Sequence, residues 1–257
     1  FNDYANAEYT GTTLAFGAFL FAIQIYCDFS GYSDIALGSA RLFGIELLRN
    51  FNYPYFSRDI AEFWRRWHIS LSTWFKDYLY IPLGGSRGGD WMRIRNTFII
   101  FLVSGFWHGA SWNFIIWGAL HGIALGIHKI WMMLTGKIFS GFNQSKVYNV
   151  LMAVLTFHFV CFCWIFFKAE DFNASMIIIK QILFDFHTET WYAFYDNYKT
   201  AIFMIVVAMA IHSIPNDIAD RLPKISFAVY IMVFFVFLVL YAYFKAAEQV
   251  MPIYLQF

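Results

Sequence analysis

A histidine stands in the middle of a long segment without charged side chains. His108 occurs in the sequence S-G-F-W-H-G-A-S-W, and the run 96–128 that contains it has no Asp, Glu, Lys or Arg. An ionisable group inside a membrane span is costly and is therefore by default a candidate for function. Imidazole has an unperturbed pKa near neutrality, which suits it to remove a proton from a reacting group. We therefore predict that His108 acts as a general base.

A packing role is the alternative for this histidine. Ser104, Gly105, Gly109 and Ala110 are small, and such residues let two helices approach closely while an imidazole hydrogen-bonds across the contact. The cost of placing an ionisable group in a span favours the functional interpretation of His108.

A second histidine lies on an amphipathic segment. In the stretch 59–80, apolar residues recur at spacings of three and four, which predicts an amphipathic or re-entrant α-helix. His68 falls along the edge of the apolar face, whereas Arg65 and Arg66 turn toward water or lipid phosphates. The proline and four glycines of the stretch 81–89 predict the end of this helix.

Helical geometry ranks the histidines that follow His108. If the run 96–128 formed one continuous helix, about 220° of rotation would separate His121 from His108. His121 and His128 would then point away from His108, and we predict that neither is its partner. The residues predicted to share the face of His108 are Ser104, Ser111 and Trp112.

The remaining histidines are interpreted as packing residues. His158 lies alone among aromatic neighbours, and His187 and His212 lie near the ends of predicted spans. The sequence has no H-E-x-x-H motif and no histidine pair at positions i and i+4, and C-F-C at 161–163 is not a convincing zinc spacing. We predict no metal site.

The elements that position these residues are predicted to be membrane helices. Of the 257 residues, 60% are hydrophobic and only 14% are charged, against about 25% charged in ordinary soluble domains. A helix that spans the hydrocarbon core needs roughly 20 apolar residues, and the run 96–128 exceeds one span, so it is predicted to form two helices or a bent one. The other predicted spans are residues 12–27, 147–167, 200–214 and 226–244, with loops at 168–173 and 185–199. The fold class is therefore an all-α, polytopic transmembrane helical bundle.

Charge placement predicts which side of the membrane one region faces. Half of the 18 basic residues fall between Arg41 and Arg95, and by the positive-inside rule this region is expected to be cytoplasmic. Cys27, Cys161 and Cys163 lie in apolar segments, give no disulfide framework and are interpreted as packing residues.

Three long motifs resemble one family of membrane enzymes. They are Y-C-D-F-S-G-Y-S-D-I-A-L-G-S-A-R-L-F-G-I, then N-F-N-Y-P-Y-F-S-R-D-I-A-E-F-W-R-R-W-H-I-S-L-S-T-W-F-K-D-Y-L-Y-I-P-L-G-G, then F-L-V-S-G-F-W-H-G-A-S-W-N-F-I-I-W-G-A-L-H-G. Together with the ending P-I-Y-L-Q-F, they closely resemble the membrane-bound O-acyltransferase (MBOAT) family, nearest to its bacterial alginate O-acetyltransferase branch. The motifs cover most of residues 25–122. Family members are longer, so the resemblance implies that residues 1–257 are the C-terminal part of a single MBOAT membrane domain without its N-terminal spans.

The resemblance also implies site residues. The near-invariant histidine of the family falls on His108, and the second signature position falls on His68. Both are expected in a tunnel through the membrane that joins a cytoplasmic donor to an acceptor on the other side. Residues expected to line the tunnel are Trp64, Trp67, Ser104, Trp107, Ser111 and Trp112.

Basic residues near the predicted cytoplasmic mouth suggest where a donor binds. Arg65, Arg66 and Arg87 could meet the phosphates of an acyl-CoA, and lipid headgroups are the equally favoured alternative. No bound cofactor is expected, and acetyl-CoA is expected as donor substrate.

The leading interpretation is a multi-pass acetyltransferase of the bacterial inner membrane. It would move acetyl from acetyl-CoA to hydroxyls of an exported polysaccharide, directly or through a periplasmic SGNH-type acetyltransferase or esterase, in contact with the exopolysaccharide machinery and not with nucleic acid. D-alanyl or other acyl transfer to a cell-wall polymer is the nearest rival. A non-catalytic transport or scaffold subunit of an export complex is the alternative of a different class.

Overall fold

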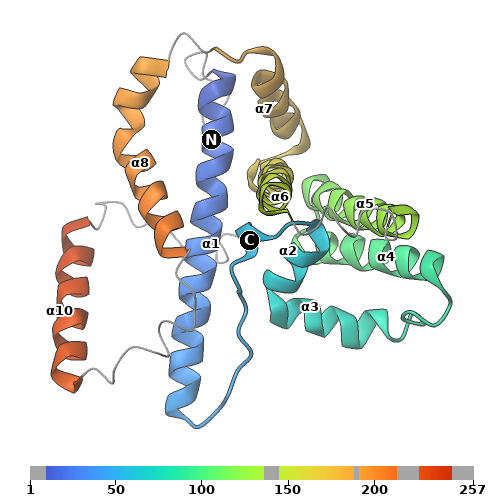
Figure 1. Ribbon diagram of the computed structural model, residues 1–257, viewed down its shortest axis with the longest axis horizontal. Coiled ribbons are helices and arrows are strands. Elements are labelled where there is room, and N and C mark those ends of the chain that lie inside the picture. Colours follow the sequence, from blue (N-terminus) through green and yellow to red (C-terminus); the bar gives the residue numbers. More distant parts are fainter. Residues whose placement is uncertain (1–9, 136–144, 188–190, 213–225, 245–257) are drawn as a thin grey trace. The chain divides into compact units, whose positions relative to one another are not determined.

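The computed structural model describes residues 10–135, 145–187, 191–212 and 226–244 (Figure 1). The chain divides into two compact units, one up to Lys199 and one from Thr200 to Gln256. The first unit contains every predicted site residue.

All regular structure in the described residues is helical, which confirms the all-α prediction. Three of these helices, α1, α5 and α6, are long and apolar enough to cross a membrane. The elements are α1 (Gly11–Leu42), η1 (Pro54–Phe56), α2 (Ile60–Arg66), α3 (Ile69–Phe75), the π-helical turn η2 (Lys76–Tyr80), α4 (Asp90–His108), α5 (Trp112–Thr135), α6 (Lys146–Lys168), α7 (Phe172–Phe184), α8 (Trp191–His212) and α10 (Phe227–Phe244).

The first helix is longer than the predicted span 12–27. It continues to Leu42 because no proline interrupts it and a single glycine costs a helix only about 1 kcal/mol. It ends where Gly44 adopts a left-handed φ of 72°, and the amide of Gly44 donates to the carbonyl of Arg41 at 3.0 Å.

The predicted helix at 59–80 is helical but not continuous. Asp59 caps α2 by accepting a hydrogen bond from the amide of Glu62 at 2.7 Å. The helix then stops at Trp67, whose backbone is extended, and α3 begins two residues later, at Ile69. The periodicity of the apolar residues continues through this break, so the sequence pattern did not reveal it.

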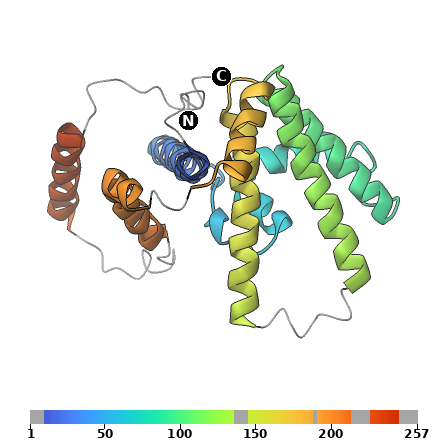
Figure 2. The same ribbon diagram turned by 90° about the horizontal axis from the view of Figure 1, so that it is seen from above.

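The uncharged run 96–128 forms two helices, as predicted. α4 and α5 lie side by side as a hairpin (Figures 1 and 2). Glycines allow this approach, because a Cβ at Gly105 would collide with the carbonyl of Phe114, and one at Gly118 with the carbonyl of Phe101. The break at residues 109–111 removes the assumption of one continuous helix, on which the predicted faces of Ser111, Trp112 and His121 relied.

The core of the first unit is centred on α6, which lies between α1 and α5 (Figure 2). Its fully buried residues include Val160, Cys163 and Trp164, and Cys161 is also buried. The packing role predicted for Cys161 and Cys163 is therefore confirmed. Cys27 is exposed, contrary to that prediction, because it lies on a face of α1 that this unit leaves uncovered.

The remaining boundaries match the predictions in part. The predicted span 147–167 is α6, the loop after it is short, and α10 covers the predicted span 226–244. The predicted loop 185–199 is wrong from Trp191 onward, because α8 begins there. The helix α7 was not predicted. Asp171 begins it by accepting a hydrogen bond from the amide of Ala174 at 2.7 Å.

Candidate active site

The candidate residue His68 sits at the break between α2 and α3. Its backbone is left-handed, with φ 45° and ψ 55°. A non-glycine residue persists in this conformation only where its surroundings hold it. Two backbone hydrogen bonds of 3.0 Å do so: the amide of Ile69 donates to the carbonyl of Asn50, and the amide of Asn52 donates to the carbonyl of Arg66.

The side chain of His68 is half-buried between polar and aromatic neighbours. Its Nδ1 lies 3.3 Å from Oδ1 of Asn50, and its ring packs edge to face against Phe29 of α1 with centroids 4.6 Å apart. Burial, and then the charge of His108, lower the pKa of His68 to about 4, so the ring is neutral at pH 7. The electrostatic influence of His108 adds to the effect of burial on this imidazole.

His108 is the last residue of α4 and is held by rings. Its imidazole lies 5.2 Å from Trp117 and 5.1 Å from Phe167, both near perpendicular. Gly109 ends the helix in an extended conformation, and a Cβ there would lie 2.6 Å from the ring of Phe114. Within the described residues the imidazole of His108 makes ring contacts but no hydrogen bond. Both of its nitrogens are therefore available for reactants.

Trp117 stands between His108 and a third histidine, His121. The ring of Trp117 lies 5.0 Å from that of His121, which is fully buried. Nε1 of Trp64 donates to Nδ1 of His121 at 3.2 Å, whereas Nε2 of His121 has no hydrogen-bond partner in the described structure. His121 is thus a buried member of an aromatic cluster, one tryptophan ring away from His108.

A cavity of about 230 Å³ opens between α2, α3, η2, α4 and α5. It is lined by three predicted site residues, Trp64, Arg65 and Ser104. Since Ser104 precedes His108 by one helical turn on α4, the cavity reaches to within a turn of the candidate base. Lys76 also lines it, and a neighbouring cavity of about 450 Å³ shares Ala61, Tyr80, Thr97 and Leu125 with it and adds Arg93 and Lys129.

The other predicted lining residues lie elsewhere. Trp67 is 2% exposed and packs in the core against Phe51 and Trp164. Trp107 and Trp112 are exposed at the α4–α5 junction, because the helix ends between them. Ser111 is half-buried, and its Oγ accepts a hydrogen bond from the amide of Asn113 at 3.3 Å.

The predicted donor-binding arginines differ in their surroundings. Arg66 donates to Oε1 of Glu62 at 2.6 Å and to the carbonyl of Tyr53 at 3.4 Å. Burial by itself raises the pKa of Glu62, but the hydrogen bonds from Arg58 and the charges of Arg66 and Arg58 lower it overall. Arg66 is thereby engaged in holding α2.

The two remaining arginines are exposed. Arg65 lines the 230 Å³ cavity, whereas Arg87 does not line it or its neighbour.

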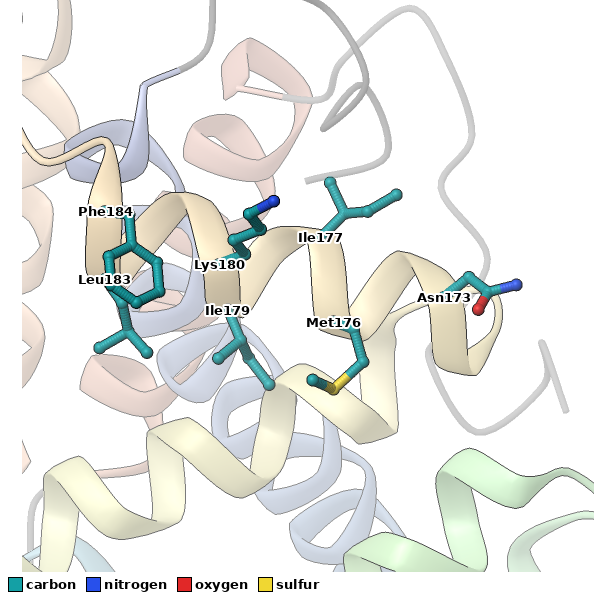
Figure 3. Close-up of a pocket in the computed structure, with 7 residues that line it drawn as sticks. All are labelled: Asn173, Met176, Ile177, Ile179, Lys180, Leu183 and Phe184. Atoms are coloured by element: carbon teal, nitrogen blue, oxygen red, sulfur yellow. The ribbon is translucent and has the colours of Figure 1, made fainter.

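A third cavity, of about 530 Å³, carries none of the predicted residues. Its lining side chains all come from α7 and are mostly apolar (Figure 3): Asn173, Met176, Ile177, Ile179, Lys180, Leu183 and Phe184. With Lys180 as its single ionisable side chain, this surface lacks the groups that acid–base chemistry needs.

Residues 2–169 match the sequence profile of MBOAT, the membrane-bound O-acyltransferase family. This match covers well over half of the 257 residues and contains both candidate histidines. The chain belongs to this family. The family motifs named above therefore lie on the break at His68 and on the α4–α5 hairpin.

Individual relatives of the family are similar over the same region. The chain is 46% identical over 163 residues to the peptidoglycan O-acetyltransferase of Helicobacter pylori, covering 63% of this chain and 30% of that protein. It is 45% identical over 173 residues to the probable alginate O-acetylase AlgI of Pseudomonas aeruginosa, covering 67% and 31%. It is 31% identical over 160 residues to the teichoic acid D-alanyltransferase of Bacillus subtilis, covering 60% and 40%. The chain thus spans about a third of the length of these relatives.

Three residues of the site were not found from the sequence. Asn50 and Trp117 contact the two histidines from 18 and nine residues away, and neither spacing is characteristic of a local motif. Lys76 was counted among the basic residues of its region but not as a cavity residue. Its helical position, on the same segment as Arg65, was the available signal.

Proposed function

We propose that the protein transfers an acetyl group from acetyl-CoA, bound from the cytoplasm, to hydroxyls of an exported polysaccharide. The observation that carries this proposal is a pair of half-buried histidines packed against aromatic rings, His68 and His108, together with a cavity that has basic side chains and reaches to within one helical turn of His108. The names of the O-acetyltransferase relatives support the acetyl group and a polymer as acceptor.

The chemistry assigns the proton transfers to His108. An acyl thioester reacts readily with an alkoxide but slowly with a neutral hydroxyl. His108 takes the proton of the acceptor hydroxyl while the hydroxyl oxygen bonds to the thioester carbonyl carbon. His108 then gives this proton to the sulfur as the C–S bond breaks. General base catalysis of this kind typically contributes about 10²- to 10⁴-fold. His68 holds either the acceptor hydroxyl or the thioester oxygen by a hydrogen bond.

Basic residues of the cavity provide a binding site for the donor phosphates. Arg65 and Lys76 both line the 230 Å³ cavity, and neither forms an ion pair within the described residues. Their charges are therefore available to phosphate oxygens. The engagement of Arg66 with Glu62 makes it the weakest of the three arginines for this role.

The proposed setting is the bacterial inner membrane, with residues 41–95 on the cytoplasmic side and a periplasmic SGNH-type protein as a relay to the polymer. Residues 86–89 are exposed, and cysteines introduced near Gly88 should react with a membrane-impermeant thiol reagent only after the inner face is opened. Labelling of intact cells from outside would refute this orientation.

D-alanyl transfer is the second candidate, supported by the teichoic acid D-alanyltransferase relatives. The acetyl-transfer relatives have the higher identity over the longer alignments, 45–46% over 163 and 173 residues against 31% over 160 and 40% over 121 residues, and so favour acetyl. A non-catalytic export subunit differs from both because it would not consume a donor.

One experiment separates these three functions. Purified protein in lipid vesicles is incubated with radiolabelled acetyl-CoA, or with D-alanine on its carrier protein, and an acceptor polysaccharide. Release of coenzyme A together with labelled polymer supports acetyl transfer, and transfer of D-alanine alone supports the second candidate. No turnover of either donor, in the presence of the periplasmic partner, would leave the export subunit as the explanation.

A further inference from the structure

The orientation of the Asn50 side chain is fixed by a backbone group. The amide of Ser70 lies 3.1 Å from one end of the carboxamide of Asn50, and a backbone N–H can only donate. The end of the carboxamide that faces Ser70 is therefore the oxygen. The other end agrees, because Nδ2 of Asn50 donates to Oγ of the buried Ser33 at 3.4 Å. Hydroxyl Oγ of Ser70 donates to the same Oδ1 at 2.6 Å.

This orientation determines the tautomer of His68. Oδ1 of Asn50 has no hydrogen to donate, and it lies 3.3 Å from Nδ1 of His68. Nδ1 must therefore carry the hydrogen of the neutral ring, which leaves Nε2 with a lone pair. The hydrogen bond made by one ring nitrogen of a neutral histidine thus determines the state of the other nitrogen.

The backbone around Asn50 prevents this pair from drifting apart. The carbonyl of Asn50 accepts from the amide of Ile69, the residue that follows His68, at 3.0 Å. Asn50 thus contacts His68 through its side chain and the peptide group of Ile69 through its backbone. The left-handed conformation of His68 is part of the same arrangement, because it turns Ile69 back toward Asn50.

We infer that Asn50 is a positioning residue that fixes His68 as a hydrogen-bond acceptor toward the substrate. This inference rests on the proposed function and decides between the two roles left open for His68. A lone pair on Nε2 cannot donate to a thioester oxygen, but it accepts from a hydroxyl. The reacting hydroxyl gives its only proton to His108, so a different hydroxyl of the acceptor donates to His68. The inference therefore implies an acceptor with more than one hydroxyl group.

The test measures the tautomer directly. Protein labelled with ¹⁵N in its imidazoles is studied by nuclear magnetic resonance in lipid nanodiscs near pH 7, and His68 is assigned from its absence in His68→Asn. We expect a neutral ring protonated at Nδ1, which is the minor tautomer of free histidine. Protonation of His68 at Nε2 in the unmodified protein would overturn the inference, whether or not the protein transfers acetyl groups. An inactive protein with the Nδ1 tautomer counts against the proposed function alone.

Matched variants separate positioning from folding. Asn50→Asp keeps an acceptor for Nδ1 and should keep the tautomer, whereas Asn50→Leu should lose it, with acetyl transfer falling on the order of tenfold, as for other partners that orient a histidine. Ser70→Ala removes a hydrogen bond to the same oxygen but leaves His68 untouched, and should retain both tautomer and activity. An unchanged tautomer in Asn50→Leu, or a His68 without a hydrogen on Nδ1 in Asn50→Asp, would show that Asn50 does not set it.

Discussion

His68 and His108 are both half-buried, yet different kinds of contact position them. His68 is held by polar contacts: an amide oxygen on Nδ1 and two backbone hydrogen bonds around a left-handed residue. His108 is held by the faces and edges of aromatic rings at a helix end, without a hydrogen bond in the described residues. A polar anchor fixes which nitrogen is protonated, whereas ring contacts fix the position of an imidazole and leave both nitrogens free.

The difference fits a division of labour. A general base needs a nitrogen lone pair that can take up the proton of the reacting hydroxyl, and within the described residues neither nitrogen of His108 is engaged in a hydrogen bond. A residue that only orients a substrate benefits from a fixed tautomer. We therefore propose proton transfer for His108, on which the near-invariant histidine of the family falls, and orientation for His68, and each assignment can be broken by substitution.

Replacement of His108 should have the largest effect. His108→Ala removes the base, and we expect acetyl transfer to fall by about 10²- to 10⁴-fold, with the protein still inserted because its neighbours include Gly109. The measurement is O-acetyl content of the exported polymer at matched membrane expression. Normal acetylation in this variant would overturn the assignment of the base.

Replacement of His68 should have the next largest effect, and its size should depend on the new side chain. His68→Ala should lose most activity, whereas His68→Asn should keep a part because an amide oxygen also accepts a hydrogen bond. Initial rates with purified protein and acetyl-CoA provide the comparison. Equal loss in both variants would mean that His68 titrates during the reaction, as a base does.

The sequence predicted the elements of this site better than their contacts. The two helices of the run 96–128 follow from its length and lack of charge. The break at His68 does not follow from the sequence, because the apolar spacing of α2 and α3 continues across it while Asn50, from a distant turn, supplies the hydrogen bonds that hold it. Trp67 was expected in a tunnel and lies in the core for a similar reason, since Trp164 of α6 covers it.

His121 shows how one wrong assumption affects a prediction. Rotation along a single helix placed it opposite His108, but the break at Gly109 makes that rotation meaningless, and Trp117 brings the two histidines to either side of one ring. Its complete burial in an aromatic cluster is typical of a packing residue. The family resemblance does not depend on helix rotation, and it remains the basis for the prediction that His108 is the base.

Replacement of His121 should therefore affect stability more than catalysis. His121→Ala opens a space beside Trp117 and leaves Nε1 of Trp64 without its acceptor, and an unpaired buried donor typically costs about 1–3 kcal/mol. We expect a lower melting temperature in detergent and nearly normal activity per folded molecule. The control is His158→Ala. The side chain of His158 is exposed, and its Nδ1 hydrogen-bonds to the carbonyl of Val154 on the same helix. Loss of turnover in fully folded His121→Ala would give this residue a place in the chemistry.

The smallest expected effect is a dependence of stability on pH through His68, which lies outside the three candidate spans. Its pKa is lowered from 6.5 to about 4 in the folded protein. As the pH falls through 6.5 the unfolded chain binds a proton there, while the folded protein does not until about pH 4, so the unfolded state is favoured increasingly between these values. The stabilisation by neutral His68 is thus complete above pH 6.5 and decreases toward pH 4. Melting temperatures of the unmodified protein and His68→Asn should differ most near neutral pH and converge on acidification. A difference that stays constant across this range would show that the site does not hold His68 in its neutral form, and with that the contrast between an anchored His68 and a free His108 would fail.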